Sequence, residues 1–141
     1  MRAMTHDVGR FIEAQSAIYP AALAELRRGR KLSHWMWFIF PQVAGLGFSE
    51  MSRRFAITSL DEARAYLDDP VLGPRLHECC EAMLATTGRS AEAILGPIDA
   101  VKLRSSMTLF HRADPEDRTF PEVLERFFDG LPDAATDRLL G

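Results

Sequence analysis

Two stretches of the sequence carry side chains that could bind a small molecule or take part in chemistry. The first runs from Lys31 to Ser49 and contains both tryptophans of the chain. Aromatic rings bury a large apolar area and offer planar faces on which a base or a sugar can stack. Trp35 and Trp37 are therefore candidates for the wall of a ligand site.

Polar residues and glycines flank these rings. The polar side chains are Lys31, Ser33, His34, Gln42 and Ser49. Glycine lets a backbone approach a ligand and present its N–H groups, and Gly45 and Gly47 follow the rings. An imidazole can act as acid or base near neutral pH, so His34 is the candidate for proton transfer. In the alternative interpretation the rings fill a core, the glycines serve turns and the histidine satisfies a helix end.

The second stretch is a polar stripe on an otherwise apolar helix. Asp99, Lys102 and Ser106 recur on one helical face, with Ser105 beside them. Such a stripe must be paired internally or line a cavity. An Asp99–Lys102 ion pair with two capping hydroxyls is the internal alternative, and a pocket for phosphate or carboxylate is the functional one. A serine nucleophile with a desolvated lysine as its base is a third.

Other chemistry finds less support in the sequence. Residues 77–81 contain His, Glu and Cys, but their spacing does not place four ligands around one ion, so we expect no metal site. No phosphate-binding loop of the Gly-x₄-Gly-Lys-Ser/Thr type occurs, and the cofactor stays unknown. Cys79 and Cys80 are adjacent, which disfavours a disulfide between them, so we expect free thiols on an apolar helix face.

Charge is distributed unevenly along the chain. Residues 1–55 carry eight Lys and Arg against four Asp and Glu, although the whole chain has a net charge of −3. A basic face of this kind can attract a small anion, but the domain is not basic enough to predict nucleic-acid binding. An alternative function is a protein or nucleic-acid interaction module that uses Arg27, Arg28, Arg53 and Arg54 as one surface. The oligomeric state is open.

Neither a membrane segment nor a secretion signal is expected. The longest apolar run, at residues 35–41, falls well short of the roughly 18–20 residues that a bilayer requires. The first residues lack the apolar stretch of a signal peptide. We therefore expect a soluble, cytoplasmic protein.

Helical periodicity dominates the chain and predicts one all-α domain over residues 1–141. A short helix at 34–40, capped by Ser33 and apolar all round, must be surrounded by protein. No period-2 alternation or hairpin turn suggests a sheet. The predicted helices are Val8–Ser16 (opening after Thr5 and Asp7), Pro20–Arg28, His34–Phe40, Glu50–Phe55, Leu60–Leu67, Val71–Thr86, Ser90–Leu95, Pro97–Arg112 and Pro121–Asp129, with a turn after Pro132.

A family resemblance covers nearly the whole chain. The run Gly29-Arg-Lys-Leu-Ser-His-Trp-Met-Trp-Phe-Ile-Phe-Pro-Gln, followed by Gly45-Leu-Gly-Phe-Ser, resembles the signature of domain-of-unknown-function family 1810, a bacterial family sometimes labelled calpastatin. Segments 11–15, 66–67, 72–76 and 102–110 also match, whereas Pro20 departs from the pattern at a helix start. The resemblance implies a multihelical fold with one enclosed helix. It implies no activity, cofactor or catalytic residue.

These observations predict a site where the aromatic segment meets the polar stripe. We expect a small anionic or nucleotide-like ligand there, contacted by Lys31, His34, Gln42, Lys102 and the stripe serines. If the motif specifies the fold alone, the same side chains will interlock without leaving space for a ligand.

Overall fold

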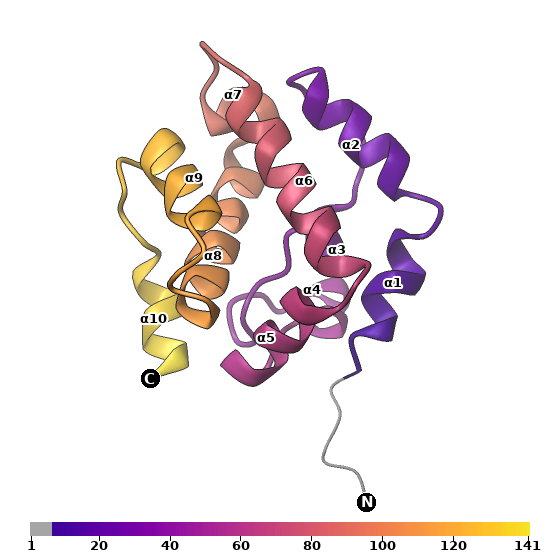
Figure 1. Ribbon diagram of the computed structural model, residues 1–141, viewed down its shortest axis with the longest axis vertical. Coiled ribbons are helices and arrows are strands. Elements are labelled where there is room, and N and C mark those ends of the chain that lie inside the picture. Colours follow the sequence, from indigo (N-terminus) through magenta and orange to yellow (C-terminus); the bar gives the residue numbers. More distant parts are fainter. Residues whose placement is uncertain (1–6) are drawn as a thin grey trace, which may run out of the picture.

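The computed structural model describes residues 7–141, which form ten helices (Figure 1). Within this range there is no β-strand, and a single isolated parallel bridge joins Val43 to Ile57. The predicted all-α class is confirmed, while Thr5 lies outside the described residues. The helices are α1 (Gly9–Gln15), α2 (Tyr19–Arg27), α3 (Met36–Ile39), α4 (Glu50–Arg54), α5 (Leu60–Asp68), α6 (Leu72–Ala85), α7 (Ala91–Leu95), α8 (Pro97–Ala113), α9 (Thr119–Phe128) and α10 (Ala134–Leu140).

Short polar side chains begin several of these helices. Ser49, Ser59, Ser90 and Asp133 each accept a hydrogen bond from a backbone N–H in the first turn of the helix that follows. Such caps satisfy donors that would otherwise lack an intrahelical partner. The caps therefore fix where α4, α5, α7 and α10 start.

The longest helix, α8, organises the C-terminal half. It packs against α5, α7, α9 and α10, and in Figure 1 it runs behind α9. Its inward side chains, including Leu103, Met107 and Phe110, are fully buried. The polar stripe predicted from the sequence is thus carried by a helix that other elements surround on several sides.

The aromatic helix is shorter than predicted. It begins at Met36 rather than His34, because Trp35 has a non-helical backbone (φ −145°, ψ 7°). Ser33 does not cap it, since its hydroxyl donates to the Glu25 carboxylate instead. The prediction that this helix is enclosed is confirmed, because Met36, Phe38 and Ile39 are buried.

The predicted free thiols agree with the structure. Cys79 and Cys80 are free and buried on α6, as the apolar face of that helix predicts. Among residues 7–141 no helix combines the length and the apolar character needed to cross a bilayer.

Candidate functional site

The segment that enters the aromatic helix is held by a buried carboxylate. Glu25, near the end of α2, accepts hydrogen bonds from the backbone N–H groups of Leu32 (2.8 Å) and Ser33 (3.0 Å). It also accepts from the Ser33 hydroxyl (2.7 Å) and the Trp35 indole N–H (2.9 Å). One side chain therefore sets the path of residues 32–35, and Leu32, which it anchors only through the backbone, stays exposed.

This carboxylate is held in its charged form. Burial alone would raise the pKa of Glu25, but the hydrogen bonds from Leu32, Ser33 and Trp35 outweigh that effect and lower the pKa to about 2. Glu25 could not be recognised from the sequence, because a single glutamate in α2 gives no local sign of the loop that is bound to it.

The two lysines of the chain share one carboxylate. Lys31 Nζ lies 2.9 Å from Asp99 Oδ2, and Lys102 Nζ lies 3.5 Å from Asp99 Oδ1. Each ammonium also lies over a tryptophan: Lys31 is 5.1 Å from the Trp35 ring centroid and Lys102 is 5.0 Å from that of Trp37. We call Lys31, Asp99 and Lys102 the lysine–aspartate cluster, which carries one positive charge in excess.

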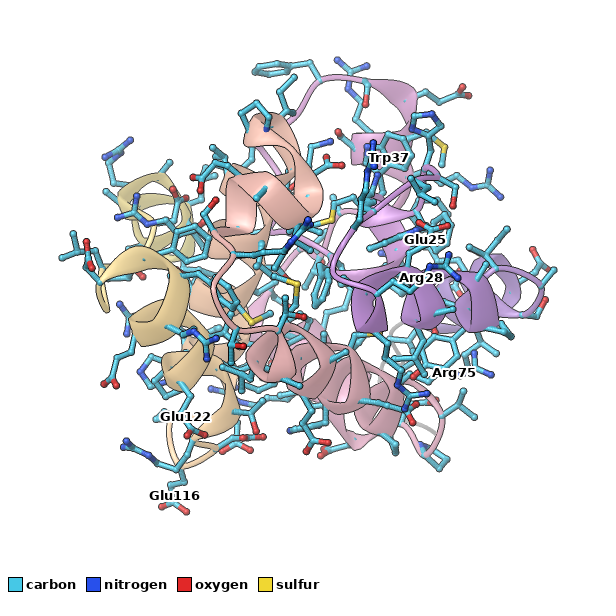
Figure 2. The ribbon with its side chains drawn as sticks, turned by 90° about the horizontal axis from the view of Figure 1, so that it is seen from above. Glu25, Arg28, Trp37, Arg75, Glu116 and Glu122 are labelled. Atoms are coloured by element: carbon cyan, nitrogen blue, oxygen red, sulfur yellow. The ribbon has the colours of Figure 1, made fainter. Side chains whose placement is uncertain are left out.

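The tryptophans do not form a free stacking surface. Trp35 is fully buried, its indole N–H is bonded to Glu25, and Lys31 covers its ring. Trp37 is half-buried, and Lys102 lies over its ring. The expectation that these rings wall a ligand site is wrong for Trp35, because the core encloses it completely. Seen from above, Trp37, Glu25 and Arg28 lie away from the acidic Glu116 and Glu122 (Figure 2).

An open cleft of about 490 Å³ lies beside the cluster. The start of α8, the loop before α4 and the start of α10 contribute its walls, and we call it the α8 cleft. Four residues of the predicted site, Gln42, Gly47, Lys102 and Ser105, come together here. The remaining lining residues are Leu46, Ser52, Pro97, Ile98, Val101, Asp133 and Ala135.

The polar groups of the α8 cleft differ in what they can bind. Lys102 supplies an ammonium group, which only donates hydrogen bonds. The Gln42 side-chain amide can donate and accept, and within residues 7–141 Gln42 is hydrogen-bonded only through its backbone carbonyl, which accepts from Ile57. Ser105 and Asp133 lie in a hydrogen-bonded chain with Thr136. The cleft therefore offers a cation, an unpaired amide and a carboxylate.

The loop that carries Gln42 is fixed from both sides. The Ala44 N–H donates to the Ile57 carbonyl (2.8 Å), and the Ile57 N–H donates to the Gln42 carbonyl (2.9 Å). Gly45 has φ +102°, a conformation that side-chain-bearing residues rarely adopt, and a Cβ on Gly47 would lie 2.4 Å from Ser52 Oγ. A second hollow of about 240 Å³ borders the other side of this loop.

Other predicted site residues lie outside the α8 cleft. Lys31 belongs to the cluster but does not line the cleft, and His34 and Ser33 are exposed beyond it. Ser49 caps α4. Ser106 is fully buried, and its hydroxyl has no hydrogen-bond partner in the described chain. The structure therefore does not bring Lys31, His34 and Lys102 to one cavity, because only Lys102 lines the α8 cleft.

Arginines of the N-terminal half line two different hollows. Arg27 and Arg28 border a cleft with Arg89 at the end of α2, at the top of Figure 1. Arg53 instead borders the hollow beside the Gln42 loop, and α4 lies in the lower half of that view. The interaction module stays a prediction of the sequence.

A family model and a solved structure match this chain. The family model "Protein of unknown function (DUF1810)" matches residues 5–140. The crystal structure of the conserved hypothetical protein Rv1873 from Mycobacterium tuberculosis is similar, with 49% sequence identity and a TM-score of 0.94, over 95% of this chain and 96% of that one. No curated protein matches the chain. The chain belongs to the DUF1810 family, as its central motif indicated.

Proposed function

We propose that this member of the family binds a small anionic ligand in the α8 cleft. The observation that carries the proposal is the position of Lys102 and Gln42, a cation and an unpaired amide that line the same open space. Both groups can donate hydrogen bonds to a carboxylate or a phosphate. Lys102 also approaches Asp99 and the Trp37 ring, and its side chain stays partly exposed.

The lysine–aspartate cluster supports binding at Lys102 rather than at Lys31. Lys102 is farther from Asp99 (3.5 Å against 2.9 Å), and its side chain is more exposed (22% against 8%). Two ammonium groups that share one carboxylate leave a positive charge to be balanced. An anion beside Lys102 provides that balance, in a site where partial burial weakens screening by solvent.

The walls of the cleft favour a ligand with an apolar part. Ile98 and Val101 are 74% and 60% exposed, although both are large aliphatic residues, and Leu46 and Pro97 adjoin them. Covering apolar surface contributes roughly 25 cal/mol per Å² removed from water. An anion with a hydrocarbon or ring body therefore fits better than an inorganic ion.

The proposal concerns binding rather than a reaction. Ser105 and Lys102 do not contact each other as a nucleophile and its base, because Ser105 is bonded to Thr136 while Lys102 approaches Asp99. His34, the candidate for proton transfer, is not part of the cleft. These positions support a binding site more strongly than an active site.

A matched pair of lysine variants tests this proposal. Lys102→Met removes the ammonium at the cleft and keeps most of the apolar stem, whereas Lys31→Met removes the other ammonium from the same cluster outside the cleft. We expect calorimetry with 4-methylpentanoate, phenyl phosphate and adenosine 5′-monophosphate to detect binding of at least one compound. Affinity should fall at least about tenfold in Lys102→Met, as for loss of a charge-assisted hydrogen bond.

Lys31→Met should weaken binding less than Lys102→Met, because Lys31 contributes to the excess charge of the lysine–aspartate cluster but does not line the α8 cleft. The neutral amide 4-methylpentanamide serves as the ligand control and should bind least. Equal losses in the two variants, or no binding of any of the three anions, would contradict the proposed site.

A further inference from the structure

A chain of three side chains runs from the wall of the α8 cleft to the first turn of α10. Ser105 Oγ lies 2.8 Å from Thr136 Oγ1, and Thr136 Oγ1 lies 2.6 Å from Asp133 Oδ2. The Thr136 backbone N–H also donates to Asp133 Oδ2, at 2.9 Å. Ser105 and Asp133 line the cleft, whereas Thr136 is fully buried behind them.

The chemistry of these groups fixes the direction of every hydrogen in the chain. A carboxylate has no hydrogen to donate, so the single hydroxyl hydrogen of Thr136 points to Asp133. Thr136 Oγ1 can then only accept from Ser105, which uses the one hydrogen of Ser105. The part of the cleft formed by Ser105 and Asp133 therefore presents acceptors and no donor.

One oxygen of the Asp133 carboxylate has no hydrogen-bond donor among the described residues. Thr136 occupies Asp133 Oδ2 with two hydrogen bonds, while no described residue donates to Oδ1. Ser105 is only 1% exposed, so Asp133, which is half-buried, is the acceptor that a ligand can reach. Its position is set by Thr136 and by the hydrogen bond from its own backbone N–H to Thr108 Oγ1, at 2.8 Å.

We infer that the ligand carries a hydrogen-bond donor, a hydroxyl or an ammonium group, which Asp133 accepts while its anionic group contacts Lys102. This inference rests on the proposed function and adds a second recognition element to it. Lys102 and Ser105 are three residues apart on α8, which places their Cβ atoms about 5–6 Å apart. One small molecule can therefore contact both Lys102 and Asp133. A simple fatty acid has no donor for the Asp133 carboxylate.

Two pairs of compounds that differ only in their donors test the inference. Adenosine 5′-monophosphate is compared with its 2′,3′-dideoxy analogue, and leucine with 4-methylpentanoate, by calorimetry. We expect the donor-bearing member of at least one pair to bind about tenfold more tightly, as for a hydrogen bond to a charged acceptor. The nucleotide pair reports on hydroxyl donors and the leucine pair on ammonium.

The variant Asp133→Asn removes the charge but keeps an oxygen that can cap α10, because asparagine is a good N-cap residue. Asp133→Ser is a second variant that keeps a cap without a carboxylate, and Asp114→Asn is the control at an exposed aspartate outside the cleft. The preference for donors should shrink to within about twofold in both Asp133 variants and persist in Asp114→Asn.

Three other outcomes have distinct meanings. If both members of each pair bind the wild type equally, the inference is overturned while the anion site stands. If the preference survives in both Asp133 variants, the donor is recognised elsewhere and the inference is also overturned. If none of the four compounds binds, the inference fails, and the proposed function fails with it when phenyl phosphate does not bind either.

Discussion

Glu25 is the side chain on which the course of residues 32–35 depends. A carboxylate that accepts four hydrogen bonds at a buried position is costly to neutralise, because the donors then lose their partner. The Glu25 carboxylate orients Trp35 through its hydrogen bond to the indole N–H, and the Lys31 ammonium lies over the Trp35 ring. A residue outside the motif thus determines the geometry within it.

Glu25→Gln should lower the free energy of unfolding by about 1–2 kcal/mol at pH 7, because a neutral amide oxygen accepts more weakly than a carboxylate from the N–H groups of Leu32, Ser33 and Trp35. The folded pKa of about 2 lies below the usual glutamate value. The stabilisation is therefore complete above a pH of about 4.5 and disappears as the pH falls toward 2.

Urea unfolding of wild type and Glu25→Gln between pH 2 and pH 7 measures this effect, with the exposed Glu13→Gln as control. The difference between wild type and Glu25→Gln should shrink steadily below a pH of about 4.5. A difference that stays constant over the whole range would show that the charge of Glu25 contributes nothing.

At the scale of elements, α5 and α6 meet so closely that only glycine fits between them. A Cβ on Gly73 would lie 2.2 Å from the backbone oxygen of Leu67, an atom that cannot move without shifting α5. Gly73→Ala should lower the free energy of unfolding by about 2–4 kcal/mol, as for overpacking against a fixed backbone. Chemical denaturation measures the change.

Gly9→Ala is the matched control for that substitution. Its Cβ would meet only Asp7 Oδ1, at an ordinary 3.5 Å, on the first turn of α1. It should change stability by less than about 1 kcal/mol, in the stabilising direction. If the two alanine variants are equally stable, the close approach of α5 and α6 does not constrain the fold.

A histidine joins α6 to the turn before α9. His77 Nδ1 donates to the Gly73 carbonyl (2.9 Å), and Nε2 lies 2.5 Å from Asp117 Oδ2. Both partners only accept, so both ring nitrogens carry hydrogen and the ring is cationic. Burial alone would lower the pKa of His77, but the Asp117 carboxylate and the Gly73 carbonyl raise it.

The His77–Asp117 pair should make stability depend on pH. Its contribution, about 1 kcal/mol for a partly exposed pair, is complete below the unfolded histidine pKa of about 6.5 and is lost as the pH rises through the raised folded value. The pKa of Asp117, which burial alone would raise, is lowered chiefly by the His77 hydrogen bond, so the contribution persists down to acidic pH.

Unfolding of wild type and His77→Gln at pH 5.5 and pH 9 should show the larger difference at pH 5.5. His34→Gln, at an exposed imidazole, is the control and should show no such trend. A larger difference at pH 9 than at pH 5.5 would mean that the imidazole bridges these elements in its neutral form.

At the scale of the whole molecule, the sequence predicted the fold class and most helices, because the apolar periodicity and the capping residues are local signals. It placed the start of α3 too early, since the competing partner of Ser33 lies on another helix. Lys102 and Ser105 were selected because a polar stripe on a buried helix lines a cavity or is paired, and Gln42 and Gly47 because they flank the aromatic rings.

The rest of the candidate site could not be predicted from local patterns. Asp133 reaches the α8 cleft only because α10 packs against α8, and the shared Asp99 depends on how residues 31–35 are held by Glu25. His34 was selected for its chemistry, but the turn that carries it points to the surface. Contacts between distant segments decided each of these positions.

The central claim is that an anion binds beside Lys102 and not beside Lys31, and the two indole N–H signals of ¹⁵N-labelled protein test it most directly. Trp37 lies under Lys102 and Trp35 under Lys31, and Trp35→Phe identifies the two signals. During titration with adenosine 5′-monophosphate or 4-methylpentanoate, the Trp37 signal and the Gln42 side-chain amide should shift saturably. The Trp35 signal should not shift, and the substitution Lys102→Met should abolish the shifts of the Trp37 and Gln42 signals. Equal shifts of both indoles, shifts that persist in Lys102→Met, or no shift at all would contradict the site.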